Sequence, residues 1–503
     1  MCGVLCVIYP YYQYYVDQDA TAYFVIAKRY AAGDYSKAIN GYWSPWSCWL
    51  TAILIKGGLQ AMCAAVIANT LAATGFIFIS QSFFVRFNIG RTLQWLFNIT
   101  LALFLCYAIF WQLFDDLWEC FFLLCTLRLV LGDNFNTKPV LWIATGFIGA
   151  LAYFAKAYSL PFFILNTLLC VIFLTKGRQW IAISMVIFGI MAVCCVPWIW
   201  LLHHKYGEWT SSTAGNLNLS WYLAGHRFFK PDIALLLPPV YNDGVSHWDD
   251  PYIINGMTPL FWSSGRMFAL QIMRIGYNML KFSRSINEIS AFFLFTYLLA
   301  MGLFFSKRVR NYFPLQLPIV ALSFLLFPLG FIFINFEPRY IWYMLPLSLV
   351  MGGLVLEQIP LVAGRSYLYK LIIVVFCLSY LVCPILGLKS IFNSGKQDYQ
   401  LSQKLNSYHI HGSFTTNLVP DVSDFSAYRY AWFSGNAYYN LKEKDAPQQL
   451  LLTEMQRYHV KYYLYFHSEL DSNGFKLMDK DGKPYPEVTG NGIPTLQVFL
   501  INP

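Results

Sequence analysis

Two pairs of acidic side chains stand where apolar stretches of the sequence end. Asp17 and Asp19 follow the apolar start of the chain, and Asp115 and Asp116 follow the uncharged run 92–114. A carboxylate at the edge of a membrane can act as a general base, or it can position a cation or a substrate. Two such pairs on one side of a membrane would supply both functions.

Each acid also has a structural interpretation, because acids often cap helices. Asp19 is well placed to cap a helix from Ala20 to Ala32, which Gly33 would end. One face of that helix is apolar. We therefore expect it to lie on a membrane surface with Lys28 and Arg29 toward the head groups.

Two basic side chains stand at similar boundaries. Lys156 interrupts the otherwise apolar region 146–161, and Arg339 belongs to the turn Phe336-Glu-Pro-Arg-Tyr340. As a planar and permanently charged fork, an arginine binds phosphate well. The structural alternatives are that Lys156 only ends a helix at the interface and that Arg339 only pairs with Glu337.

The composition excludes a soluble globular protein. Hydrophobic residues make up 57% of the chain and charged residues 12%, and the mean hydropathy is +0.47. These values indicate a polytopic membrane protein. The 12 cysteines lie in or next to apolar runs, which is typical of small core residues and not of a disulfide framework. The net charge of +9 fits anionic lipid or a phosphorylated substrate, and the sequence has no basic tract for nucleic acid.

Apolar runs of the length that crosses a bilayer follow one another down to about residue 390. They are 57–85, 92–114, 139–155, 157–175, 179–204, 289–306, 311–336, 340–356 and 371–388. The shorter run 117–131 and the apolar start 1–16, a helix that we expect to begin upstream, complete a prediction of about eleven spans.

Basic residues of the short loops predict the orientation of these spans. Arg86, Lys138, Lys176, the cluster Lys307-Arg308-Val-Arg310 and Arg365 fall on one side if the helices alternate. That side is expected to be cytoplasmic. The loops 17–45 and 203–288 and the tail then share the opposite side, and 259–284 is expected to form an amphipathic surface helix.

The tail is polar from residue 393 onward. Its expected elements are a helix at 447–459, a strand at 460–466, a hairpin at Asp481-Gly482 and a last strand at 496–501. The predicted fold is therefore an all-α polytopic membrane domain, residues 1–392, followed by a small α/β domain, residues 393–503, on the non-cytoplasmic side.

Four segments, taken together and in order, resemble a known family. They are Asp19-x-x-x-Tyr23-x-x-Ile26-Ala27-x-x-Tyr30-x-x-Gly33-Asp34 with Ala38-Ile-Asn-Gly-Tyr-Trp-Ser-Pro45, then Asp116-Leu117, Ala155-Lys156-Ala-Tyr158 and Glu337-Pro-Arg339-Tyr340. Each is similar to an outer-face segment of the GT-C glycosyltransferases. The bacterial protein mannosyltransferase-like and lipid A aminoarabinose transferase-like enzymes are the most similar branch, and the resemblance covers about residues 10 to 390.

The resemblance implies an enzyme of a bacterial inner membrane, with its site and tail in the periplasm. The donor would be a polyprenyl-phosphate-linked sugar, and a hexosyl or pentosyl group would pass with inversion to a hydroxyl or phosphate of a glycan, lipid or protein acceptor. Carboxylates at a phosphate site suit Mg²⁺ or Mn²⁺, whereas one acid acting alone as base needs no metal. The sequence leaves both open.

The same resemblance assigns roles to individual residues. Asp19 would be the catalytic base, with Asp17 as the alternative because Gln18 separates the two acids. Asp116 would be the second acid, for the acceptor or for a metal ion. The other assigned positions are Lys156 and Arg339 for the donor phosphate, and Tyr23, Trp43, Asp115 and Glu337 for the substrate and its loop.

Two other classes of protein would also carry boundary charges or a tail. A transporter or flippase of a lipid-linked sugar would line a pathway with the same charges, but such proteins usually have repeated halves with broken helices. The sequence shows no such repeat, and its acids gather at one surface. A scaffold that only presents the tail would have no need of a charge such as Lys156.

Overall fold

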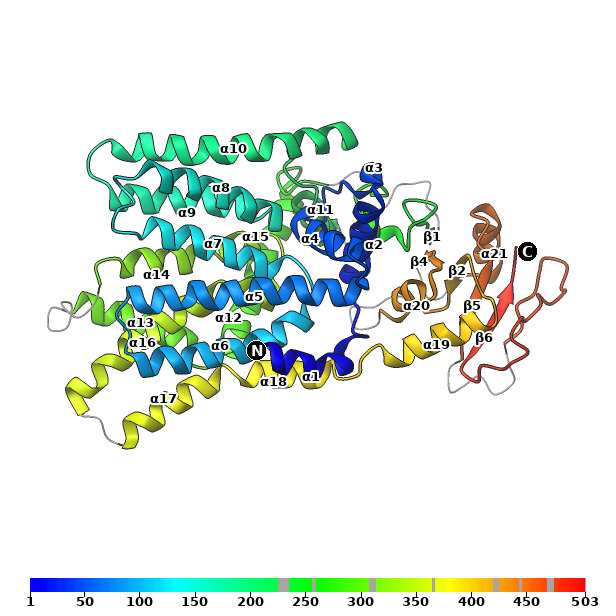
Figure 1. The fold of residues 1–503 in the computed structure, drawn as a ribbon. Helices are drawn as coiled ribbons and strands as arrows, with labels where there is room; N and C mark the ends of the chain where they lie inside the picture. The colour runs from blue at the N-terminus through cyan, green and yellow to red at the C-terminus, as the bar shows by residue number, and fades with distance from the viewer. Residues whose placement is uncertain are drawn as a thin grey trace.

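The structure, a computed structural model, describes most of the chain. The described residues are 1–224, 235–255, 259–306, 314–363, 367–418, 425–442, 446–467 and 475–502. The helices form a bundle of roughly parallel rods, and the C-terminal segment lies at one end of it (Figure 1). The basic cluster Lys307–Arg310 and Arg365, on which part of the predicted orientation rests, lie outside the described residues.

The bundle helices coincide closely with the apolar runs of the sequence. They are α5 (Ala61–Arg86), α6 (Arg91–Trp111), α7 (Asp116–Val130), α8 (Pro139–Ala155), α9 (Ser159–Leu174), α10 (Gln179–Tyr206), α13 (Phe293–Phe305), α14 (Leu317–Leu326), α15 (Leu329–Phe333), α16 (Met344–Ala363), α17 (Tyr367–Ser379) and α18 (Val382–Ser390). Two expected runs are broken, near Pro328 and near Pro384. A proline has no amide hydrogen to continue the helical bonding, so the regular helix is interrupted there.

Only some of these helices are long enough to cross a membrane alone. Among the described residues four qualify by length and composition: α5, α6, α10 and the stretch 367–390. A fifth is obtained if α12 (Gly265–Ile289) and α13, which meet at 91°, are one span. Shorter apolar helices of 10–17 residues are α1 (Cys2–Tyr12), α8, α9, the stretch 317–333 and the part 344–358 of α16. The total of about eleven spans therefore stays a prediction.

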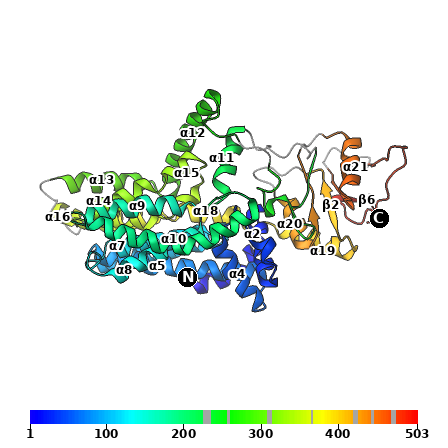
Figure 2. The same ribbon diagram turned by 90° about the horizontal axis from the view of Figure 1, so that it is seen from above.

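The end of the bundle that carries the C-terminal segment also carries several shorter elements, and we call it the site end. These elements are α1 (Cys2–Tyr12), α2 (Gln18–Ala32), α3 (Tyr35–Ala38), α4 (Pro45–Lys56), α11 (Ala214–Ala224) and the 3₁₀ turn η1 (His247–Asp249). α2 runs across the bundle axis (Figures 1 and 2). Gly33 ends it in the left-handed conformation, φ 83°, as the sequence predicts.

The expected exposure of Arg29 to lipid head groups is wrong, whereas Lys28 is exposed. Arg29 is only 6% exposed, and its guanidinium lies 3.7 Å from Asp249 and 3.6 Å from Asp243. The Lys28 ammonium lies 3.9 Å from the ring centre of Trp432. The outer loop and the C-terminal segment cover α2, and the local amphipathic pattern contains no information about such distant partners.

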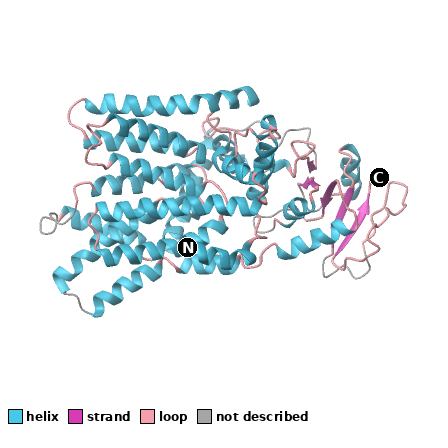
Figure 3. Cartoon of the chain, viewed as in Figure 1, coloured by secondary structure: helices cyan, strands magenta, loops and turns pink. Residues whose placement is uncertain are grey.

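The C-terminal segment contains a small sheet with helices beside it (Figure 3). Its elements are α19 (Lys396–Ser407), β2 (Ser413–Thr416), α20 (Ser426–Ser434), β3 (Ala437–Tyr438), β4 (Asn440–Leu441), α21 (Gln448–Arg457), β5 (Tyr462–Phe466) and β6 (Leu496–Leu500). The sheet has the order β3-β2-β5-β6, with only β5 and β6 antiparallel. β4 pairs with β1 (Leu236–Leu237) of the outer loop, so the two segments are joined by backbone hydrogen bonds. The division of the chain at residue 392 stays a prediction.

Candidate active site

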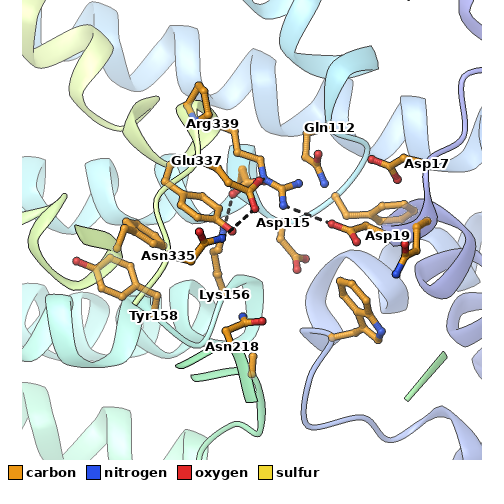
Figure 4. A pocket seen from close by; sticks show the side chains of 18 of the residues that line it. Asp17, Asp19, Gln112, Asp115, Lys156, Tyr158, Asn218, Asn335, Glu337 and Arg339 are labelled. Carbon is orange, nitrogen blue, oxygen red and sulfur yellow. Dashed lines mark hydrogen bonds and ion pairs between the residues drawn. The ribbon is translucent and has the colours of Figure 1, made fainter. Parts of the chain in front are cut away.

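A cavity of about 1820 Å³ lies at the site end of the bundle, and Figure 4 shows part of its lining. All of the site residues predicted from the sequence line it: Asp17, Asp19, Tyr23, Trp43, Asp115, Asp116, Lys156, Glu337 and Arg339. The chain brings them there from the start of α2, the loop before α4, the start of α7, the break between α8 and α9, and the turn before α16. Their predicted catalytic and binding roles stay predictions.

The two acids of the first loop have different environments. Asp17, and not Asp19, caps α2: its Oδ1 accepts from the amide of Ala20 at 2.7 Å. The predicted cap is therefore wrong, because the helix begins two residues earlier than expected. Burial raises the pKa of Asp17 to about 7, and the nearby charge of Asp19 contributes to the rise.

Asp19 lies in the first turn of α2 and faces the cavity. Its Oδ2 accepts from Nη2 of Arg339 at 3.3 Å, and its Oδ1 accepts from the indole Nε1 of Trp248 at 3.0 Å. Its side chain is 25% exposed. Arg339 and Trp248 both donate hydrogen bonds to the carboxylate and so hold it in place. The part of the carboxylate that remains exposed is open to the cavity.

Arg339 connects three acids at the site. It belongs to the 3₁₀ turn η3 (Pro338–Ile341), and its side chain is 13% exposed. Its Nε lies 2.8 Å from Glu337 Oε2 and 3.8 Å from Asp116 Oδ2, while Nη2 reaches Asp19. The ion pair with Glu337 that was the structural alternative is present, and the guanidinium faces the cavity as well.

Lys156 provides a second cation at the same place. It has an extended backbone, φ −156° and ψ 127°, where α8 ends, so its side chain leaves the helix toward α7. Its ammonium bonds to Asp116 Oδ1 and lies 3.9 Å from Glu119 Oε2 and 4.0 Å from the ring centre of Tyr340. The sequence analysis missed Glu119, although the spacing Asp116-x-x-Glu119 on a helix places both acids on one face.

Aromatic side chains form the wall beside Asp19. Tyr23 stacks on Phe114 with ring centres 4.3 Å apart and meets Trp43 edge to face at 5.0 Å. The indole of Trp43 donates to the carbonyl oxygen of Trp248 at 2.9 Å. Asp115 is buried next to this wall and has a φ of 49°, which is unusual for a residue other than glycine.

Trp248 is a site residue that the sequence analysis did not find. Its local sequence, Trp248-Asp-Asp-Pro251, is typical of a turn, and nothing in that sequence connects Trp248 to Asp19. Its ring stacks on Trp221 at 5.1 Å between centres. Hydrogen bonding to Asp19 across 229 positions of sequence can only be seen in the folded chain.

Buried ion pairs hold the turn that carries Trp248. Asp249 and Asp250 are fully buried; Asp249 lies near Arg29, and Asp250 lies 2.8 Å from the ammonium of Lys205. Burial raises the pKa of Asp249 to about 7. Removing one partner of such a pair leaves an uncompensated charge, so these pairs fix the loop against α2 and α10.

One wall of the cavity is apolar. It is formed by residues of α6 and α18, namely Tyr107, Trp111, Val382, Cys383, Leu386 and Gly387. The polar residues Asn287, Glu288, Ser379 and Ser390 also line the cavity. The cavity therefore offers a ligand an apolar surface in addition to its charged cluster.

The described residues do not form a built site for Mg²⁺ or Mn²⁺. No group of three acidic, histidine or cysteine side chains converges in the described part of the chain. The candidate metal ligand Asp116 has a cation on each oxygen, Lys156 and Arg339. These cations would repel a divalent ion, so we derive no step through a metal.

The sequence matches no protein-family model and no curated protein. Among solved structures, ArnT from Cupriavidus metallidurans bound to undecaprenyl phosphate matches with a TM-score of 0.57 at 11% identity, over 99% of this chain and 97% of that one. Its apo state gives a TM-score of 0.55 at 11% identity, over 99% and 96%. The Archaeoglobus fulgidus oligosaccharyltransferase, in complex with Zn and sulfate, gives 0.51 at 12% identity over 90% of this chain, which spans 64% of that protein. At these identities the likeness is one of fold.

Proposed function

From its GT-C fold, which it shares with membrane glycosyltransferases, we propose that this protein transfers a sugar from a polyprenyl-phosphate-linked donor to an acceptor hydroxyl or phosphate. The transfer inverts the anomeric carbon, and the group transferred is a hexosyl or pentosyl unit. The site end and the C-terminal segment face the periplasm of a bacterial inner membrane.

Lys156 and Arg339 bind the donor phosphate. Both line the cavity and both lie beside Asp116, so a phosphate that enters there meets two fixed positive charges. Negative charge grows on the phosphate as the glycosidic bond breaks. Preorganised cations at that position stabilise the transition state more than the ground state.

Asp19 is the general base. It takes the proton of the acceptor hydroxyl, whose oxygen then forms the new bond to the anomeric carbon. The bond from that carbon to the phosphate oxygen breaks, and polyprenyl phosphate leaves with the electron pair. Asp17 is the poorer candidate, because its Oδ1 is already engaged in capping α2, where it accepts from the amide of Ala20.

The apolar wall supports a lipid-linked donor. Apolar residues of α6 and α18 line the same cavity as the charged cluster, which suits a polyprenyl chain attached to a phosphate. The proposal rests chiefly on one observation: the carboxylate of Asp19 lies 3.3 Å from the arginine that is offered to the phosphate. Base and leaving group are thus held at one reacting centre.

The test is sugar transfer by purified protein with radiolabelled polyprenyl-phosphate sugars and cell-envelope acceptors. Wild type is compared with Asp19→Asn and with the control Asp34→Asn, which changes an acid outside the cavity that caps α3. We expect one donor to be consumed by wild type and by the control. Asp19→Asn should bind that donor and lose at least ~100-fold in turnover. A parallel sample with a chelator measures any requirement for a metal.

Two outcomes would overturn the proposal. If Asp19→Asn turns over as fast as wild type, Asp19 is not the base. If no donor is consumed, and liposomes that contain the protein move a lipid-linked sugar between leaflets with Asp19→Asn unimpaired, the protein is a flippase.

A further inference from the structure

In the helix α12 large apolar side chains face outward and polar side chains face the bundle, which is the reverse of a surface helix in a soluble protein. Its outward side chains are large and apolar: Phe268, Ile272, Met273, Met279 and Leu280 are all more than half exposed. α12 projects from the bundle (Figure 2) and meets α13 at 91°. Such a helix fits the boundary between acyl chains and head groups, as the sequence analysis expected for this segment.

The inward face of α12 carries a polar stripe, Gln271, Arg274 and Asn278. These positions are spaced by three and four residues and so lie on one side of the helix. Gln271 and Asn278 are buried, and the Asn278 side chain is 0% exposed. Burying a polar side chain this deeply costs free energy unless the side chain is hydrogen-bonded.

The stripe bonds to a single short stretch of chain, residues 332–335. The amide nitrogen of Gln271 donates to the carbonyl of Phe333 at 2.6 Å. That of Asn278 donates to the carbonyls of Ile332 at 2.9 Å and Ile334 at 3.3 Å. These carbonyls belong to the last two residues of α15 and to Ile334 directly after it, where no helical amide is left to satisfy them.

The same stretch leads directly to the cavity. Nη2 of Arg274 donates to Oδ1 of Asn335 at 2.8 Å, and Nδ2 of Asn335 donates to Glu337 at 3.3 Å. Glu337 in turn pairs with Nε of Arg339 at 2.8 Å. An unbroken series of contacts therefore runs from α12 to Arg339.

We propose that the polar stripe of α12 positions Arg339 for the donor phosphate. This inference rests on the proposed function, in which Arg339 binds that phosphate. Gln271, Arg274 and Asn278 are positioning residues, since they reach the site only through residues 332–337. The orientation of Arg339 toward the donor phosphate is then set by one helix at the membrane surface.

The experiment measures binding of undecaprenyl phosphate to the full protein in nanodiscs, together with KM and kcat for the donor. The variants are Asn278→Leu, which has a similar volume and no amide, and Arg274→Met, which keeps the aliphatic stem. Arg284→Gln is the control: it lies on the same helix, is 83% exposed and contacts only Glu288 among the ion pairs of the described residues. Each substitution is also made together with Arg339→Gln.

We expect Asn278→Leu and Arg274→Met to weaken undecaprenyl phosphate binding about tenfold and to raise KM, with Arg284→Gln unchanged. In the Arg339→Gln background the further loss should fall to about twofold or less, because residues that act through one another are not additive. A substitution that only loosens the fold would weaken binding equally in both backgrounds, and that result would overturn the inference.

The two proposals fail in different ways. If Arg339→Gln binds undecaprenyl phosphate as tightly as wild type, the phosphate site itself is misassigned. If Arg339→Gln binds weakly while Asn278→Leu and Arg274→Met both bind like wild type, only the role of α12 is refuted. Arg274→Met keeps the test decisive if Asn278→Leu does not fold.

Discussion

Replacing Trp248 with phenylalanine isolates one hydrogen bond at the candidate base. The indole of Trp248 donates to Asp19 Oδ1 at 3.0 Å, and phenylalanine cannot donate. The ring still stacks on Trp221, and the Trp248 carbonyl that accepts from Trp43 is a backbone group. The change therefore removes the donor and leaves the wall of the cavity in place.

The expected size of the effect follows from the geometry. A hydrogen bond to a charged group contributes about 1.5–3 kcal/mol. The Asp19 side chain is 25% exposed and keeps its contact with Arg339, so we take the lower end of that range. This corresponds to about a tenfold loss in kcat/KM.

The assay is kcat/KM for the donor that wild type consumes. Trp221→Phe is the matched control, because the Trp221 indole donates to Asn255 at 3.2 Å in the same aromatic cluster. We expect the control to keep the wild-type kcat/KM. If Trp248→Phe keeps it as well, the hydrogen bond from Trp248 does not support the base and the reasoning is wrong.

Three further changes test the charges of the site and the membrane face of α12. Lys156→Met leaves Glu119 buried without its cation and leaves Asp116 with Arg339 alone, so we expect about 3 kcal/mol lower stability and a loss of donor binding; wild-type thermal unfolding would contradict this. Asp17→Asn should stabilise the protein by ~1–2 kcal/mol at pH 8 and by less at pH 5, measured by thermal unfolding. Asp17 has a raised pKa of about 7, so the stability of the wild-type protein falls as the pH rises from about 4 to 7. If Asp17→Asn stabilised the protein equally at pH 5 and at pH 8, the raised pKa would be refuted. Met273→Glu places a carboxylate on the outward face of α12 and should lower the unfolding temperature in nanodiscs, whereas unchanged unfolding would show that this face is in water.

The sequence determined the elements of the bundle and the end of it at which the site lies. Long uncharged runs fold as helices in lipid because every backbone group must be satisfied within the segment. The bounds of α5 to α10 follow these runs closely. Charged side chains cannot enter such runs cheaply, so they collect where the runs end. Alternation of the spans then puts the loop acids, Lys156 and Arg339 on one side, and all of them line one cavity.

Only the tertiary structure decided which of these groups meet. Arg339 and Asp19 are 320 positions apart, and no helical period relates them. Asp17 caps α2 in place of Asp19 because the helix starts two residues earlier than the sequence predicts. A difference of that size is within the uncertainty of any sequence pattern. The burial of Arg29 and the bond from Trp248 depend on the outer loop folding back over α2. Periodicity is a local property of the chain, whereas the pairing of charges depends on how distant segments pack.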